Sequence, residues 1–132
     1  MGVSLAGVHH VKLPVRDPGR SRDWYQGVFG FVTELDFVED GRLMGVAMID
    51  PSSQFRFAVR RDAQRAEALA GFDPVALAVG TRADLETWVE RLDQQGVVHQ
   101  PIAKTHAGWI VNGIHDPDGI EVRLYPLERP TA

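Results

Sequence analysis

The sequence predicts an α+β fold built from two tandem β-α-β-β-β repeats. Three observations support this: a segment that alternates apolar and polar residues, a helix-type pattern directly after it, and a second occurrence of the same order later in the chain. The first repeat covers about residues 7–60 and the second about 73–128. Residues 61–72 join them as a linker with one or two helical turns. We expect residues 1–132 to form a single domain.

The first repeat opens with a strand in which Val11, Leu13 and Val15 alternate with polar residues and a proline. Asp17 is a candidate N-cap for the helix that follows, and Gly30 is a candidate stop. The apolar positions of this helix are Trp24, Tyr25, Val28 and Phe29. Three further strands are predicted at residues 31–40, 42–50 and 54–61.

The second repeat reproduces this order. Thr81 stands where Asp17 stood, the helix ends at Gly96, and Pro74 is as far from Trp88 as His10 is from Trp24. We expect Trp24 and Trp88 to pack each helix on its sheet. The remaining strands are predicted at residues 97–102, 108–115 and 119–127.

Composition excludes several classes of function. The absence of cysteine excludes disulfides, zinc–thiolate sites, iron–sulfur clusters and cysteine nucleophiles. The net charge is −4, and acidic and basic residues are mixed along the chain, so there is no basic stripe of the kind that binds nucleic acid. No apolar run reaches the ~18 residues that span a bilayer. The N-terminus has no signal-peptide pattern, so we expect a soluble, cytoplasmic protein without a membrane or nucleic-acid partner.

Three motifs resemble those of the vicinal oxygen chelate superfamily, which includes glyoxalase I, bleomycin resistance proteins and extradiol dioxygenases. His10 lies five residues before Val15 and seven before Asp17, W-Y-x-x-V-F-G-F follows at 24–31, and D-P-D-G-I-E-V stands at 116–122. The resemblance implies curled mixed sheets around a concave cup, helices on the convex side, and a homodimer. It does not single out one function, because the scaffold hosts lyases, epimerases, oxygenases and metal-free binding proteins.

The resemblance also implies four positions at which the family's metal enzymes hold a divalent ion. The first position carries His10; strand alternation turns His9 to the opposite side. The second falls on Arg56, Phe57 or Ala58, depending on how the preceding turn is aligned, and the third and fourth fall on Pro74 and Arg123. Proline offers no side-chain donor, and arginine cannot bind a cation. We therefore favour no metal and no other cofactor.

Glu121 is the nearby carboxylate, two residues from Arg123 on the same strand face. We expect these two side chains to form an ion pair in preference to a metal site. A shifted site with His10 and Glu121 as ligands, together with His115 or His106, is the alternative. A metal-free reaction with His10 as general base and Glu121 as its partner also stays open.

Strand alternation selects the residues that face the cup, and we predict that some of them bind a ligand. Cations outnumber acids in this set, which favours an anionic or oxygen-rich ligand, with Phe37 and Trp109 as aromatic walls. Two alternatives are that the charges pair with one another at a wet rim, and that Trp109 belongs to the core or a dimer interface. The predicted pocket residues are His10, Lys12, Phe37, Arg56, Trp109, Asn112, Glu121, Arg123 and Tyr125.

The preferred interpretation is a homodimer that binds a small organic ligand in its cup and has lost the usual metal site. Sequestration, sensing and metal-free chemistry are the roles open to such a protein, so the sequence does not decide whether it is an enzyme. The second interpretation is a divergent metal-dependent lyase, isomerase or dioxygenase. A purely structural dimerisation module fits less well, because the concave face is charged.

Overall fold

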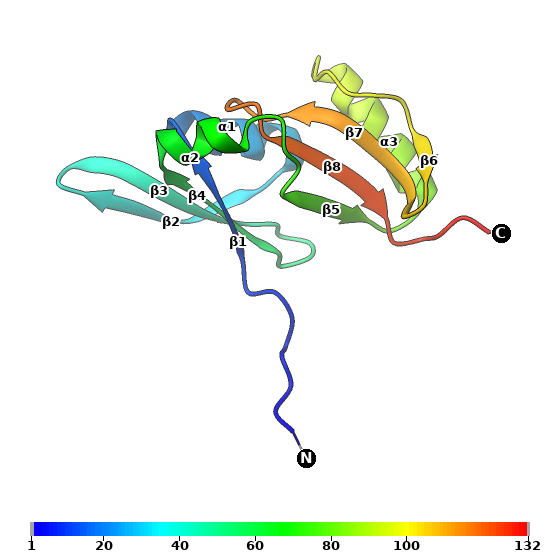
Figure 1. Ribbon diagram of the computed structural model, residues 1–132, viewed down its shortest axis with the longest axis horizontal. Helices are drawn as coiled ribbons and strands as arrows, with labels where there is room; N and C mark the ends of the chain where they lie inside the picture. The colour runs from blue at the N-terminus through cyan, green and yellow to red at the C-terminus, as the bar shows by residue number, and fades with distance from the viewer. Residues whose placement is uncertain (1, 132) are drawn as a thin grey trace. The chain divides into compact units, whose positions relative to one another are not determined.

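The computed structural model describes residues 2–131, which form eight strands and three helices in the predicted order (Figure 1). The chain divides into two compact units, the first ending at Ala63 and the second beginning at Gln64. Each unit contains a four-stranded mixed sheet and one β-α-β-β-β repeat. The predicted α+β class with two repeats is therefore confirmed. The cup expected between the sheets stays a prediction, and each unit is described by itself.

The sheet of the first unit has the strand order β1-β4-β3-β2. β1 pairs in parallel with β4, and the other neighbours are antiparallel. β2 is exposed along its whole length. The bounds are β1 Val11–Val15, α1 Pro18–Phe29, β2 Val32–Glu39, β3 Arg42–Ile49 and β4 Arg56–Arg61.

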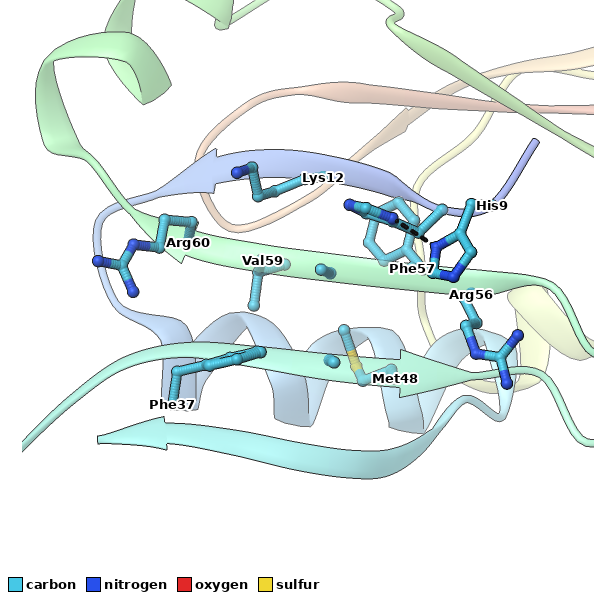
Figure 2. A pocket seen from close by; sticks show the side chains of 11 residues that line it. His9, Lys12, Phe37, Met48, Arg56, Phe57, Val59 and Arg60 are labelled. Carbon is cyan, nitrogen blue, oxygen red and sulfur yellow. Dashed lines mark hydrogen bonds between the residues drawn. The ribbon is translucent and has the colours of Figure 1, made fainter. Parts of the chain in front are cut away.

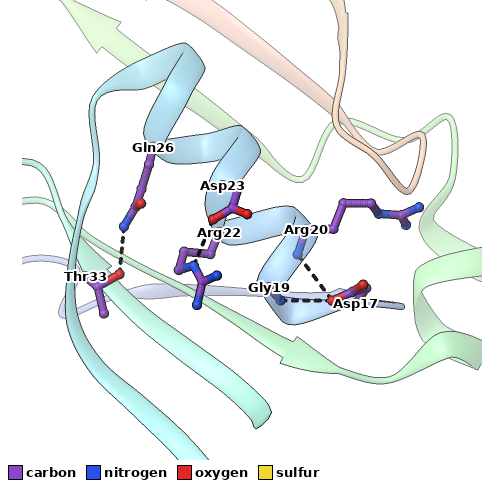
Figure 3. Close-up of polar contacts among 7 residues, drawn as sticks. All are labelled: Asp17, Gly19, Arg20, Arg22, Asp23, Gln26 and Thr33. Carbon is purple, nitrogen blue, oxygen red and sulfur yellow. Dashed lines mark hydrogen bonds and ion pairs between the residues drawn. The ribbon is translucent and has the colours of Figure 1, made fainter.

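Helix α1 begins and ends at the residues that the sequence indicates. The Asp17 carboxylate accepts hydrogen bonds from the backbone N–H groups of Gly19 and Arg20 at 3.1 and 3.2 Å (Figure 3). These amides have no partner inside the helix, so the carboxylate satisfies them. The helix ends at Gly30, whose φ of 82° is the left-handed conformation that glycine adopts without strain.

The core of the first unit lies between its sheet and α1. Leu13, Val15, Phe57 and Val59 are at most 2% exposed, and the ring of Tyr25 lies 4.7 Å from that of Phe57. Because successive strand residues point to opposite faces, the residues between these apolar ones face away from the helix. This second surface, the open face of the sheet, carries Lys12, Arg56, Ala58 and Arg60.

The second unit repeats this arrangement with the strand order β5-β8-β7-β6. Thr81 and Asp84 form a capping box at the start of α3, and Leu85 and Leu92 are fully buried. The bounds are α2 Ala63–Leu69, β5 Val75–Val79, α3 Arg82–Gln94, β6 Ala103–Thr105, β7 Gly108–His115 and β8 Glu121–Pro126.

The prediction of a strand at residues 97–102 is wrong. This segment is a loop, and β6 is confined to Ala103–Thr105. The side chain of His99, in the middle of this loop, is only 10% exposed. Its Nε2 lies 2.6 Å from Asp93 Oδ1 of α3, and its Nδ1 lies 2.7 Å from the Gln100 carbonyl oxygen. These contacts hold the segment as a loop. Pro101 also disfavours a strand here, because it has no N–H to donate to a neighbouring strand.

The tryptophans are less buried than expected. Trp24 packs its ring edge-to-face on Tyr25 and Phe29, and Trp88 lies under the guanidinium of Arg91. Both are half-buried, so Tyr25 and Leu85 are the deeper helix residues. No helix in residues 2–131 has the length and apolarity to cross a membrane.

Replacing Asp17 with Ala is expected to lower the free energy of unfolding by about 1 kcal/mol, because two amides of α1 lose their acceptor. Urea denaturation measures the change. Asp17→Asn keeps an acceptor oxygen and is expected to retain most of the stability. An Asn variant as unstable as the Ala variant would refute the capping role.

His99 is expected to make stability depend on pH. Both of its ring nitrogens face acceptors, so only the protonated ring can donate to both. The hydrogen bond to the Gln100 carbonyl raises the pKa of His99, assisted by Asp93 and opposed by burial. A raised pKa stabilises the fold most below the ordinary histidine value of about 6.5, and the contribution disappears as pH rises through the folded-state value.

Denaturation of the native protein and of His99→Gln at pH 5.5 to 9 measures this contribution. The stability advantage of the native protein should be largest at the acidic end and shrink as pH rises. An advantage that is constant, or that grows with pH, would contradict the arrangement.

Candidate ligand-binding site

The open face of the first sheet carries a pocket of about 520 Å³ (Figure 2). Its floor is made of small side chains, because Ala47 of β3 pairs with Ala58 of β4 at the centre. Lys12 of β1 pairs with Ala58 from the other side. Four predicted pocket residues, His10, Lys12, Phe37 and Arg56, line this pocket together, and their role in binding stays a prediction.

Phe37 forms an apolar side of the pocket and lies over a glycine. It pairs with Gly45, at which a Cβ atom would lie 3.6 Å from Cδ2 of Phe37 and 2.9 Å from the carbonyl oxygen of Val59. The second distance is shorter than real Cβ contacts, so a larger residue would displace the strand. Glycine therefore keeps this part of the sheet thin beneath the half-exposed ring of Phe37.

Two of the three pocket cations are already paired. Arg56 contacts Glu34 at 3.2 Å, and Arg60 contacts Glu39 at 2.8 Å. Both acids come from β2, and the two arginines occupy opposite ends of the pocket (Figure 2). Lys12 differs, because no carboxylate in residues 2–131 pairs with its amine. The pocket therefore holds one cation that is available to a ligand.

His9 and His10 both line the pocket, so the expectation that His9 points away is wrong. The strand begins only at Val11, and alternation does not extend to the residues before it. The two Nδ1 atoms lie 2.9 Å apart, within hydrogen-bonding distance. Such a bond needs one nitrogen without a proton, so at most one of the rings is charged while it persists.

In the second unit, Glu121 and Arg123 form the expected ion pair, with Arg123 Nε 2.6 Å from Glu121 Oε2. The Gly113 amide donates to the same oxygen at 3.3 Å, and Arg123 also contacts Asp73 at 3.2 Å. Glu121 is only 9% exposed. The hydrogen bond from Arg123 holds the pKa of Glu121 below its ordinary value, although burial acts in the opposite direction.

The residues at the four metal positions do not fit an ion of the family's usual kind. Ala58 and Pro74 have no donor atom, and Arg123 brings a guanidinium held by two carboxylates. Removing Glu121 from this pair for a metal would leave the half-buried guanidinium of Arg123 with fewer partners. Within residues 2–131, no three histidine, aspartate or glutamate side chains converge.

The other predicted residues of the second unit are placed differently. Tyr125 is two residues beyond Arg123 on the same face of β8. Asn112 is half-buried, and its backbone carbonyl oxygen accepts a hydrogen bond from the backbone N–H of Gln100. Trp109 lies 5.3 Å from the guanidinium of Arg82, at the start of α3, and so is on the helix side of its sheet. We therefore leave Trp109 out of the proposed site.

Sequence reasoning missed several residues that line the pocket, among them Arg60, Ala47, Met48 and His9. Arg60 follows Arg56 and Ala58 on the same strand face, so alternation alone could have identified it. Ala47 and Met48 come from β3, whose register with β4 the sequence does not reveal. His9 could not be identified by alternation, because it precedes the strand.

Comparison with known proteins identifies the family. The family model of the Glyoxalase/Bleomycin resistance protein/Dioxygenase superfamily matches residues 7–124. A search of curated proteins finds no match.

Among solved structures, a glyoxylase/bleomycin resistance protein/dioxygenase domain from Frankia sp. EAN1pec is similar, with a TM-score of 0.72 and 24% identity over 93% of this chain and 98% of that one. TnmS3, an antibiotic binding protein from Streptomyces sp. CB03234, has a TM-score of 0.71 and 19% identity over 97% and 100% of the chains. The fosfomycin resistance protein FosX from Listeria monocytogenes, complexed with Mn(II) and sulfate ion, has a TM-score of 0.69 and 15% identity over 95% of each chain.

At these identities the solved structures support the fold alone. The match of the family model over most of the chain, together with the two β-α-β-β-β units, shows that this chain belongs to the Glyoxalase/Bleomycin resistance protein/Dioxygenase superfamily.

Proposed function

We propose that this protein binds a small organic molecule on the open face of its first sheet, without a resident metal ion. The observation that carries the proposal is the pocket of about 520 Å³, in which Lys12, without a carboxylate partner among residues 2–131, lies beside a floor of alanines. Pockets of roughly 300–1,000 Å³ suit small ligands when a mostly apolar lining is combined with a few polar groups. The antibiotic-binding protein TnmS3, which shares the fold, supports a binding role.

The proposal that the metal site is degenerate rests on the donor atoms. Three of the four family positions lack a metal-binding side chain, and the neighbouring Glu121 is bound to Arg123. Without a Lewis acid, ligand recognition depends on Lys12, the histidines and the apolar floor. Sequestration, sensing and metal-free catalysis are all compatible with such a pocket.

The second candidate is a metal-dependent lyase, isomerase or dioxygenase. A fold neighbour, FosX, is described with Mn(II), and His10 retains the first position of the family's metal site. In this case Glu121 would have to leave Arg123 and act as a ligand.

The proposal also includes a homodimer in the cytoplasm, as the resemblance and composition imply. The exposed apolar residues Val32, Leu35 and Val38 on β2 support a protein contact on this strand. Sedimentation of the purified protein tests the dimer.

Filling the pocket floor is expected to abolish ligand binding. Ala58→Leu places three more carbon atoms at the centre of the pocket, whereas Ala103→Leu makes the same change on exposed β6. A thermal-shift screen with flat aromatic compounds should find ligands that stabilise the native protein and Ala103→Leu but not Ala58→Leu. Stabilisation that survives Ala58→Leu would place binding elsewhere. The three tryptophans do not line the pocket, so tryptophan fluorescence is a poorer readout.

Protein purified without chelator is expected to contain far less than one equivalent of transition metal, and His10→Ala should leave that content unchanged. Elemental analysis by mass spectrometry measures it. One equivalent of metal that is lost on His10→Ala would overturn the metal-free proposal and favour the second candidate.

A further inference from the structure

The charges around the pocket indicate the kind of ligand that it accepts. The pocket contains three cationic side chains, Lys12, Arg56 and Arg60, and two of them are bound to carboxylates of β2. The net charge of this group is one positive unit, with the histidines taken as neutral. That unit belongs to Lys12, which pairs with Ala58, midway between the two arginines on β4.

From this arrangement we propose that the pocket selects planar organic monoanions, whose single carboxylate binds Lys12. The inference rests on the proposed function, and it specifies the substrate class of the same site. A charge-assisted hydrogen bond to Lys12 would fix the carboxylate, and the flat apolar body would lie on Ala47 and Ala58 beside Phe37.

The acids of β2 explain the selection against a second negative charge. Glu34 and Glu39 hold the guanidinium groups at the two ends of the pocket, at 3.2 and 2.8 Å. Arg56 and Arg60 are four residue steps apart on β4, which separates the two ends by roughly 13 Å. A dianion that spans the pocket would place its second carboxylate near one of these acids, and it would have to displace that acid to gain an arginine.

The pair of histidines limits its own contribution to this charge. The contact between their Nδ1 atoms at 2.9 Å admits at most one additional charge while it persists. All titrations are therefore carried out at a single pH of about 8, so that the protonation of this pair is the same for every compound.

Three naphthalene compounds of similar shape test the proposal: 2-naphthoate carries one negative charge, 2-naphthamide none, and naphthalene-2,6-dicarboxylate two. Calorimetric titration of the native protein is expected to show naphthoate binding about tenfold more tightly than the amide, the size of one charge-assisted hydrogen bond. The dicarboxylate is expected to bind no more tightly than naphthoate.

Two substitutions with matched controls assign these preferences to residues. Lys12→Ala should make naphthoate and naphthamide bind equally, whereas Lys104→Ala, the same charge change on exposed β6, should leave the tenfold ratio intact. Glu34→Gln releases Arg56 and should strengthen binding of the dicarboxylate several-fold. Asp36→Asn is its control, because Asp36 pairs with Val46 and lies on the other face of β2.

The failures are distinguishable. Equal affinity for naphthoate and the amide in the native protein, or a dicarboxylate at least tenfold tighter than naphthoate, would overturn the monoanion proposal and leave the binding function intact. A preference for naphthoate that survives Lys12→Ala would also overturn it. If none of the three compounds binds, the proposed function fails, and the monoanion proposal fails with it.

Discussion

The parallel register between β1 and β4 is the constraint on which the proposed site depends. Val11 pairs with Phe57, Lys12 with Ala58 and Leu13 with Val59, so the sheet presents an apolar face to α1 and a charged face to the pocket. A slip of one residue would bury Lys12 and expose Leu13, which is only 2% exposed, so the lost burial of apolar surface disfavours the slip. The packing of the core thereby fixes the position of the ligand-binding cation.

The two units use charge in opposite ways. In the second unit, Arg123 is held by Glu121 and Asp73, and Glu121 is nearly buried, so these charges are satisfied within the protein. In the first unit, the ion pairs of Arg56 and Arg60 are half-exposed, and such pairs contribute only about 0.2–1 kcal/mol. This contrast makes the second unit's carboxylate costly to divert to a metal, while Lys12 leaves the first unit one cation for a ligand.

Much of the fold could be predicted from local sequence patterns, because alternation and capping depend on neighbouring residues. Asp17, Gly30 and Thr81 delimit the helices as predicted. The prediction of a strand at residues 97–102 failed because the His99 ring forms hydrogen bonds with Asp93 of α3 and with the Gln100 carbonyl oxygen. The sequence pattern does not indicate these contacts. Alternation brought Lys12 and Arg56 to one face, but it could not predict that Glu34 pairs with Arg56. A register shift between Thr33 and Leu35 alters the pairing of β2 at this point.

The most direct test of this binding site is backbone amide NMR of the isotopically labelled protein titrated with 2-naphthoate in the presence of EDTA. We expect saturable chemical-shift changes on β1 and β4, centred on Lys12 and Ala58, and also at Phe37. Saturable changes that spare these residues, or binding that occurs only after a divalent metal replaces the chelator, would contradict this expectation.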